Sequence, residues 1–121
     1  MMEILNQRTY DLEDRTLAFA KETRSFVKKL PRTIANIEDS KQLIKASGSI
    51  GANDIEANEG LSKKDFLMRI KISRKEAKES RYGLKLLDTS TSKDLEDERN
   101  KLIKETTELM NIFGSILRKS K

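Results

Sequence analysis

The residues of this sequence best suited to chemistry are the basic side chains of one segment, residues 62–88. The chain has 25 basic and 20 acidic residues. Nine of the basic residues and four of the acidic residues lie in this segment, which leaves 16 of each kind elsewhere. The formal net charge of +5 is therefore concentrated here. On a helical wheel at about 100° per residue, six of the basic residues fall within an arc of about 100° that contains no acid. We call these six residues the basic ridge: Lys64, Lys71, Arg74, Lys75, Lys78 and Lys85.

A helical ridge of this kind matches the electrostatic footprint of a phosphate backbone. At about 1.5 Å per residue it would be about 30 Å long, and clustered lysine and arginine side chains are the usual means of binding RNA or DNA. The only aromatic residues in the segment are Phe66 and Tyr82, so contacts with the backbone or shape of a nucleic acid are favoured over base stacking. Two alternatives stay open: a docking face for an acidic protein, and a solvated face with local ion pairs.

Catalysis and metal binding are poorly supported by the composition. The chain contains no histidine and no cysteine, which removes the usual general base and the usual ligands of transition metals. An enzyme would need a carboxylate pair or a lysine nucleophile, and nothing organises the neighbouring Glu56 and Glu59 around a substrate. We therefore expect a protein that is not an enzyme, with no catalytic residue, no metal and no cofactor.

The sequence also contains no apolar run near 18 residues and no N-terminal segment typical of a signal peptide. We therefore expect a cytoplasmic protein that has no membrane partner.

Four helices would have to position these residues. Apolar side chains recur at steps of three and four residues, and no strand-like alternation persists. The spacing predicts an all-α fold, an antiparallel up-and-down four-helix bundle that forms one domain over residues 1–121. The predicted helices cover residues 14–29, 31–59, 62–88 and 92–119, with Pro31 at the first position of the second helix, Gly60 at its end, and Ser62 and Ser92 opening the third and fourth.

Three of these helices have one clear inner face each. On the first helix this face consists of Leu12, Thr16, Phe19, Thr23, Phe26 and Leu30. On the third it consists of Phe66, Ile70, Ser73, Ala77, Leu84 and Leu87, and on the fourth of Leu95, Leu102, Thr106, Leu109, Phe113 and Ile116. These residues are the predicted core.

The second helix is unusual because it contains the stretch SGSIGANDIEANEG at residues 47–60 and has two apolar faces. Small residues on a packing face let neighbouring helices approach closely, which offsets the cost of glycine in a helix. One face, predicted to point to the core, consists of Ile34, Ile37, Ile44, Gly48, Gly51 and Ile55. The other consists of Leu43, Ala46, Ile50 and Ala57.

We expect this second face to contact another subunit in a homo-oligomer, with Asn53 and Glu56 forming a polar network that fixes the register of the interface. The alternatives are that the four helices of one chain cover both faces, and that the polar residues form a solvated helix end.

Several short motifs of this chain resemble those of one protein family. They are SIGAN at residues 49–53, IEANE at 55–59, LSKKDF at 61–66 and RKEAKES at 74–80, with YDLEDR at 10–15 and LP at 30–31 fitting the same pattern. The chain resembles the four-helix bundle proteins called 23S rRNA intervening sequence proteins, or the S23 ribosomal protein family. Two positions depart from the family pattern, because Asp54 and Gly83 stand where an aromatic residue is common.

The resemblance implies a bacterial up-and-down bundle that assembles as a homopentamer. It also implies genes lodged in intervening sequences of 23S rRNA, with others standing free. Proteins similar in fold serve as accessory factors of diversity-generating retroelements, where they bind nucleic acid and a reverse transcriptase. The resemblance therefore implies RNA, DNA or a protein as the partner. It also implies that a large side chain is missing at Asp54 and at Gly83.

Overall fold

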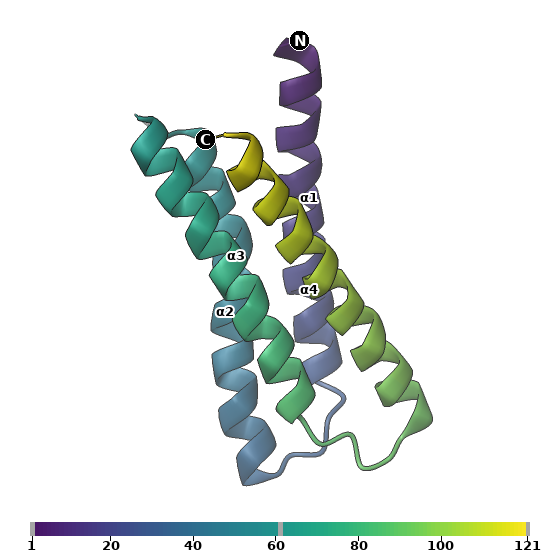
Figure 1. Cartoon of the computed structure of the whole chain (residues 1–121). Helices are drawn as coiled ribbons and strands as arrows, with labels where there is room; N and C mark the ends of the chain where they lie inside the picture. The colour runs from purple at the N-terminus through teal and green to yellow at the C-terminus, as the bar shows by residue number, and fades with distance from the viewer. Residues whose placement is uncertain (1, 61, 121) are drawn as a thin grey trace.

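Four long helices account for nearly all of the chain. The computed structural model describes residues 2–60 and 62–120, and side chains from residue 11 onward. The helices are α1 (Met2–Val27), α2 (Ile34–Asn58), α3 (Lys63–Leu86) and α4 (Lys93–Lys119). The α1–α2 and α3–α4 connections lie at one end of the molecule, and the α2–α3 connection and both termini lie at the other (Figure 1). This arrangement confirms the up-and-down four-helix bundle.

The helix starts follow from capping side chains. The hydroxyls of Thr33, Ser62 and Ser92 each accept a hydrogen bond from the backbone N–H three residues later, as expected of N-caps. The starts predicted at Ser62 and Ser92 are therefore confirmed. The start predicted at Pro31 is wrong, because Thr33 provides the cap and Pro31 lies in the connection before it.

Helix α1 begins at Met2, twelve residues earlier than predicted. The segment before residue 14 contains neither glycine nor proline, so nothing in it stops a helix from continuing toward the N-terminus.

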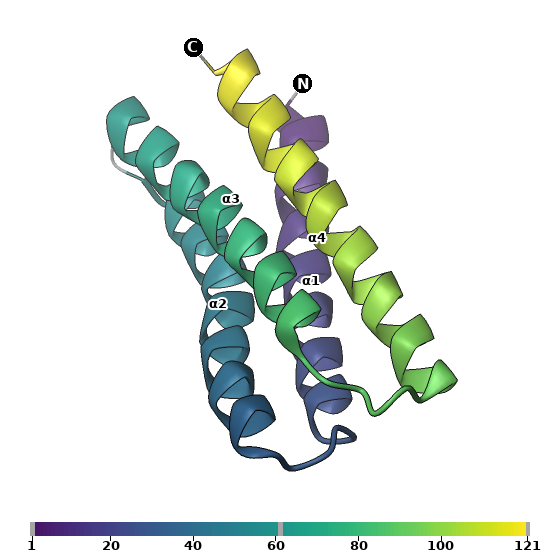
Figure 2. The same ribbon diagram turned by 60° about the horizontal axis from the view of Figure 1, so that its bottom comes forward.

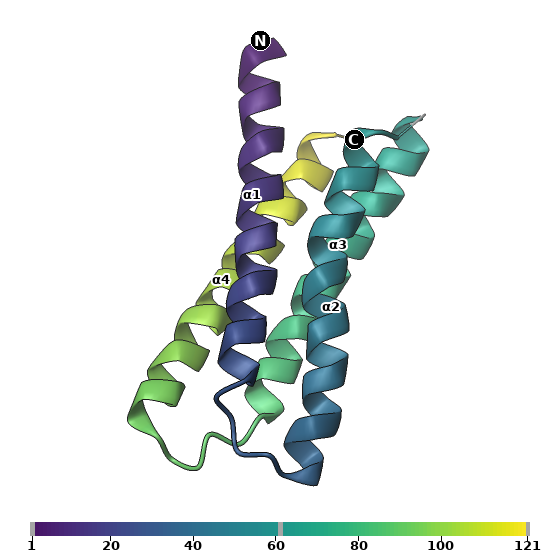
Figure 3. The ribbon, with the colours of Figure 1, turned by 180° about the vertical axis from the view of Figure 1, so that it is seen from behind.

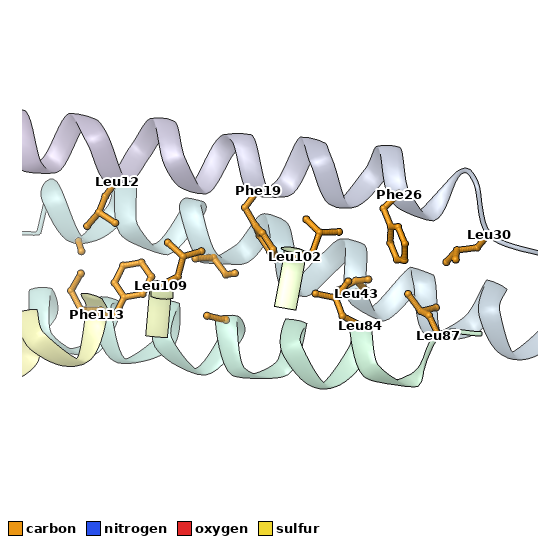
Figure 4. Close-up of a cluster of buried hydrophobic side chains, with 14 residues drawn as sticks. Leu12, Phe19, Phe26, Leu30, Leu43, Leu84, Leu87, Leu102, Leu109 and Phe113 are labelled. Atoms are coloured by element: carbon orange, nitrogen blue, oxygen red, sulfur yellow. The ribbon is translucent and has the colours of Figure 1, made fainter. Parts of the chain in front are cut away.

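The core is a column of apolar side chains along the bundle axis (Figure 4). The predicted inner faces of the first, third and fourth helices are confirmed: their residues are buried, except for Phe66, Leu95 and Ile116, which are partly buried against the column. Three threonines and a serine on these faces, Thr16, Thr23, Thr106 and Ser73, are also buried. The 3.6-residue period of the sequence thus predicts the direction of three helices correctly.

The two apolar faces of α2 are assigned the wrong way round by the sequence. Leu43, Ala46, Ile50 and Ala57, predicted to be left over for a partner subunit, are buried by the chain's own helices. Of the face predicted to point inward, Ile34, Ile37 and Ile55 are exposed. The alternative in which one chain covers both faces therefore holds for Leu43, Ala46, Ile50 and Ala57 but not for these three isoleucines.

The reason for the reversal is that α2 packs against a neighbour on each side, as Figure 3 shows for α1. The side carrying Gly51 faces Thr16 of α1, and the side carrying Leu43 faces Gly83 of α3. Leu43, Ala46, Ile50 and Ala57 lie on the side of α2 that faces α3, and the isoleucines beyond the α1 contact are left at the surface.

The seam between α1 and α4 is the least extensive of the contacts between neighbouring helices. Ion pairs bridge it: Arg15 lies 2.7 Å from Glu105, and Lys29 lies 3.1 Å from Glu98. At the same end as Lys29, the buried Asn36 side chain donates to the backbone oxygen of Asp88 at 2.8 Å and accepts from its N–H at 2.9 Å. The contacts of Asn36 tie the first turn of α2 to the α3–α4 connection, so the end of α3 is held in place.

Candidate nucleic-acid interface

Helix α3 carries the basic ridge on its outer surface. It packs against both α2 and α4, and these are the two most extensive helix contacts of the bundle. In Figure 2, α3 and α4 are both in the foreground. All six ridge residues are exposed. The structure therefore brings together on one open helix face every residue that the wheel assigned to the ridge.

On the side of α3 that faces α2, two side chains form hydrogen bonds with α2, while Nε of Arg69 and Oγ of Ser80 are buried with no partner among the described residues. The Ser73 hydroxyl, which is buried, donates to the backbone oxygen of Ile50 at 2.9 Å. Arg69 donates to the amide oxygen of Asn53 at 3.1 Å. Asn53 thus takes part in a polar contact within the chain, while Glu56 is exposed.

Carboxylates also lie along this side of the ridge. Lys75 is 3.8 Å from Glu79, so a local ion pair of the solvated-face kind does occur at one ridge residue. The pKa of the neighbouring Glu76 is raised, first by burial and then by the negative charge of Glu79. The positive charge of the ridge is therefore partly offset along its α2 side.

The side of α3 that faces α4 has a different character. Arg81 reaches across to Thr107, with an Nη–Oγ1 distance of 3.4 Å. Arg74 of α3 and Arg118 of α4 both reach the surface of Gly114: a Cβ built on that glycine would lie 3.4 Å from Nη1 of Arg118 and 3.6 Å from Nε of Arg74. None of these three arginines forms an ion pair with a carboxylate of residues 11–60 or 62–120.

Sequence reasoning did not include Arg81 and Arg118 in the site. From the sequence alone, Arg118 is a favourable positive charge in the last turn of α4. The signal that could have found it is Gly114, which stands four residues earlier on the same side of α4 and leaves room for a side chain from a neighbouring helix.

The two departures from the family pattern lie far apart. Gly83 packs on Leu43, with a distance of 3.5 Å from its would-be Cβ to the leucine Cβ. Asp54 lies eleven residues further along α2, a distance of about 16 Å by the helical rise. They therefore do not open a shared pocket.

Asp54 is an unusual residue for a bundle core. It is 2% exposed, and its Oδ2 has no hydrogen-bond partner among the described residues. Burial, and then the charge of Glu13 on α1, raise the pKa of this carboxyl to about 6. Within the described residues there is no group of three or more acidic side chains arranged to hold a metal ion.

A shallow groove runs between α2 and α3 next to the ridge. Its floor includes Leu43, Ala46 and Gly83, and Lys75 and Lys78 line its edge. Tyr82 and Leu86, at the same groove, keep 66% and 49% of their surface exposed. Asp39 and Glu79 also line it, so the groove combines apolar, basic and acidic side chains.

Comparison with known proteins identifies a family and a similar solved structure. The model of the 23S rRNA-intervening sequence protein family matches residues 8–115. A crystal structure of a protein of unknown function from the S23 ribosomal protein family of Bacteroides thetaiotaomicron is 30% identical, with a TM-score of 0.75. The match covers 88% of this chain and 97% of that one. No curated protein matches the chain.

Proposed function

Because the chain belongs to the 23S rRNA-intervening sequence protein family, we propose that it binds the phosphate backbone of a nucleic acid through the basic ridge of α3. The observation that carries this proposal is the placement of the net charge. Six exposed basic residues line one face of α3, and the segment 62–88 that contains this helix has a net charge of +5, equal to that of the whole chain. The role is one of binding rather than catalysis, and the family's name favours RNA as the ligand.

The size of the effect can be estimated from counterion release. Each phosphate neutralised on a duplex lowers log affinity by about 0.9 per tenfold increase in salt, and on a single strand by about 0.7. If most of the ridge engages phosphates, the slope is about −3 to −5. Lys75 contributes least, because Glu79 already lies beside it.

A salt titration tests the proposal. Purified, nuclease-treated protein is titrated into a labelled structured RNA and a matched DNA duplex at several salt concentrations. We expect a linear fall of log affinity with log salt, with a slope of several units, and tighter binding to RNA. Absence of binding to both ligands at about 50 mM salt would contradict the proposal.

The protein is further proposed to act in the cytoplasm as a homo-oligomer, a homopentamer as the family resemblance implies. The exposed isoleucines of α2 support self-association: Ile34 is 86% exposed, and Ile37 and Ile55 are also at the surface. The described residues include no helix long and apolar enough to cross a membrane. Light scattering coupled to size exclusion should give about five chain masses, and a monomer at tens of micromolar would contradict this assembly.

A second candidate function is the docking of an acidic protein or a partner helix. The exposed Tyr82 and Leu86, beside the ridge lysines of the α2–α3 groove, favour it. This function predicts a specific complex, captured from cell extract, that survives nuclease treatment and is lost in Tyr82→Ala. Complexes that disappear with nuclease would favour the nucleic-acid proposal instead.

A further inference from the structure

We propose that Arg74 of α3 and Arg118 of α4 form a clamp for one phosphate group, at the seam between the two helices beside Gly114. Assigning that phosphate to a nucleic-acid backbone rests on the proposed function. The clamp as a site for a tetrahedral oxyanion rests on the geometry of the two arginines alone.

The two guanidinium groups converge on one point from different helices. Nη1 of Arg118 and Nε of Arg74 lie 3.4 Å and 3.6 Å from the position that a Gly114 Cβ would occupy, so they are no more than about 7 Å apart. Charge-assisted hydrogen bonds from arginine to phosphate are about 2.7–2.9 Å long. A phosphate group, with oxygens on all sides, can therefore bridge the two nitrogens after small side-chain adjustments.

The charges of this pair are not compensated within the described residues. Both guanidinium groups are permanently protonated, both side chains are exposed, and neither forms an ion pair with a carboxylate of residues 11–60 or 62–120. Two like charges held near each other attract an anion from solution. The site is therefore complementary to a ligand that carries negative charge and several acceptor oxygens.

Other arginines of the same chain provide an internal comparison. Arg15 of α1 also reaches a neighbouring helix, and it ends on Glu105 of α4 at 2.7 Å. Arg99 lies at the α3–α4 seam, and it donates to Glu96 and to the backbone oxygen of Leu87. At these two places the chain supplies its own acceptor, whereas beside Gly114 the facing group is a second arginine.

Gly114 is what allows the two arginines to lie this close to α4. It is buried within the helix, where glycine is less favourable than alanine. The three atoms nearest to its would-be Cβ all belong to Arg118 or Arg74. The glycine thus keeps open the space between the helix backbone and the two guanidinium groups.

The clamp is tested first with inorganic phosphate as the probe. Thermal unfolding of the full chain is followed in phosphate and in chloride at equal ionic strength, for wild type, Arg74→Gln, Arg118→Gln and the control Arg32→Gln, which removes an exposed charge from the α1–α2 connection. We expect a saturable rise of the melting temperature in wild type and the control that is lost in the two clamp variants. An equal rise in all four proteins would indicate general stabilisation by phosphate and would overturn the clamp.

Direct observation of the side chains keeps the proposal falsifiable if a variant folds poorly. In ¹⁵N-resolved spectra of wild-type protein, the Nε–Hε signals of Arg74 and Arg118 should move together with one apparent dissociation constant. Unmoved signals at saturating phosphate would overturn the clamp without any substitution.

The same variants separate this inference from the proposed function. With RNA, Arg118→Gln should bind about 5- to 10-fold more weakly and reduce the salt slope by about one, while Arg32→Gln should bind like wild type. Loss of the phosphate response in the clamp variants of a protein that binds no RNA would support the clamp and contradict the proposed function. A phosphate response that is unchanged in both clamp variants of a protein that binds RNA with a steep salt dependence would overturn the clamp and support the proposed function.

Discussion

Helix α3 is packed differently along its two sides, and one glycine on each side displays the difference. Gly83 faces α2, and the atoms nearest to its would-be Cβ belong to Leu43. Gly114 faces α3 from α4, and the atoms nearest to its would-be Cβ belong to Arg74 and Arg118. The same residue type therefore serves apolar packing on one side and leaves room for charged groups on the other.

This comparison separates the parts of the molecule that stabilise it from the part proposed to bind. On the α2 side, the buried Ser73 donates to a backbone oxygen, and Lys75 has Glu79 beside it. On the α4 side, Arg74 and Arg118 have no such partner among the described residues. Substitutions on the α2 side should therefore change the free energy of unfolding, and substitutions on the α4 side should change anion binding.

The largest expected effect on stability comes from Asp54 of α2, a buried carboxyl whose Oδ2 has no hydrogen-bond partner among the described residues. Its pKa of about 6 lies above the usual 3.8, so the native state holds this proton to a higher pH than the unfolded state does. Its contribution to stability is complete below about pH 4 and is lost as pH rises through 6, a change of roughly 3 kcal/mol. Asp54→Asn should remove this pH dependence and raise the free energy of unfolding at pH 8.

Urea unfolding at pH 5 and pH 8 measures this effect. The exposed Asp14→Asn is the matched control, and it should keep the wild-type fall in stability between the two pH values. The same fall in Asp54→Asn would show that the buried carboxyl is not its source.

The next effect in size concerns the contact between α1 and α2. A Cβ at Gly51 would lie 2.8 Å from Oγ1 of Thr16, whose hydroxyl also donates to the backbone oxygen of Leu12 at 2.8 Å. Gly51→Ala should therefore destabilise the protein by about 1–3 kcal/mol, although alanine is the better helix former. A double-mutant cycle with Thr16→Ala, measured by urea unfolding, should recover most of the loss. Strict additivity would exclude this clash as the cause.

A smaller effect of opposite sign is expected at Gly83. Its would-be Cβ lies 3.5 Å from the nearest atoms of Leu43, an ordinary van der Waals distance. Gly83→Ala should raise the free energy of unfolding by about 0.5–1 kcal/mol through helix propensity. RNA affinity, measured with the same samples, should not change, and a weaker affinity would place binding on the α2 side as well.

The matched change on the other side is Gly114→Ala. The nearest atoms to the new methyl group belong to flexible arginine side chains, so the fold should accept it with a similar gain of about 0.5–1 kcal/mol. The methyl group would occupy space beside both guanidinium groups, so the stabilisation by phosphate should fall. If phosphate stabilised Gly114→Ala as much as Gly83→Ala, the proposal that Gly114 leaves room for a phosphate site and Gly83 does not would be contradicted.

The sequence predicted the parts of the fold that depend on local chemistry. The apolar period oriented three helices, and hydroxyl side chains marked the starts at Ser62 and Ser92. The prediction of the core-facing side failed for α2. The sequence of a helix with two apolar faces gives the angle between the faces but not which neighbouring helix lies on each side. The contacts of Gly51 with Thr16 and of Leu43 with Gly83 decide that question, and both are tertiary.

The candidate site was predicted to a similar extent. The ridge depends only on the period of one helix, so the exposure of its six residues follows from the sequence. The convergence of Arg74 and Arg118 depends on the axial register of α3 against α4, which no pattern within either helix contains. The burial of Asp54 likewise required the position of α2 between its neighbours.

The most direct test of the central claim is a comparison of two charge reversals on RNA binding. Lys71→Glu with Lys75→Glu changes the ridge, and Lys41→Glu with Lys45→Glu makes the same change in net charge and spacing on α2. The control is close, because Lys41 and Lys75 each lie beside a glutamate, at 3.2 Å and 3.8 Å. We predict that the ridge variant binds at least about tenfold more weakly near 100 mM salt, with a salt slope reduced by about two, while the α2 variant loses much less. Equal affinities for the two variants would contradict binding through the ridge.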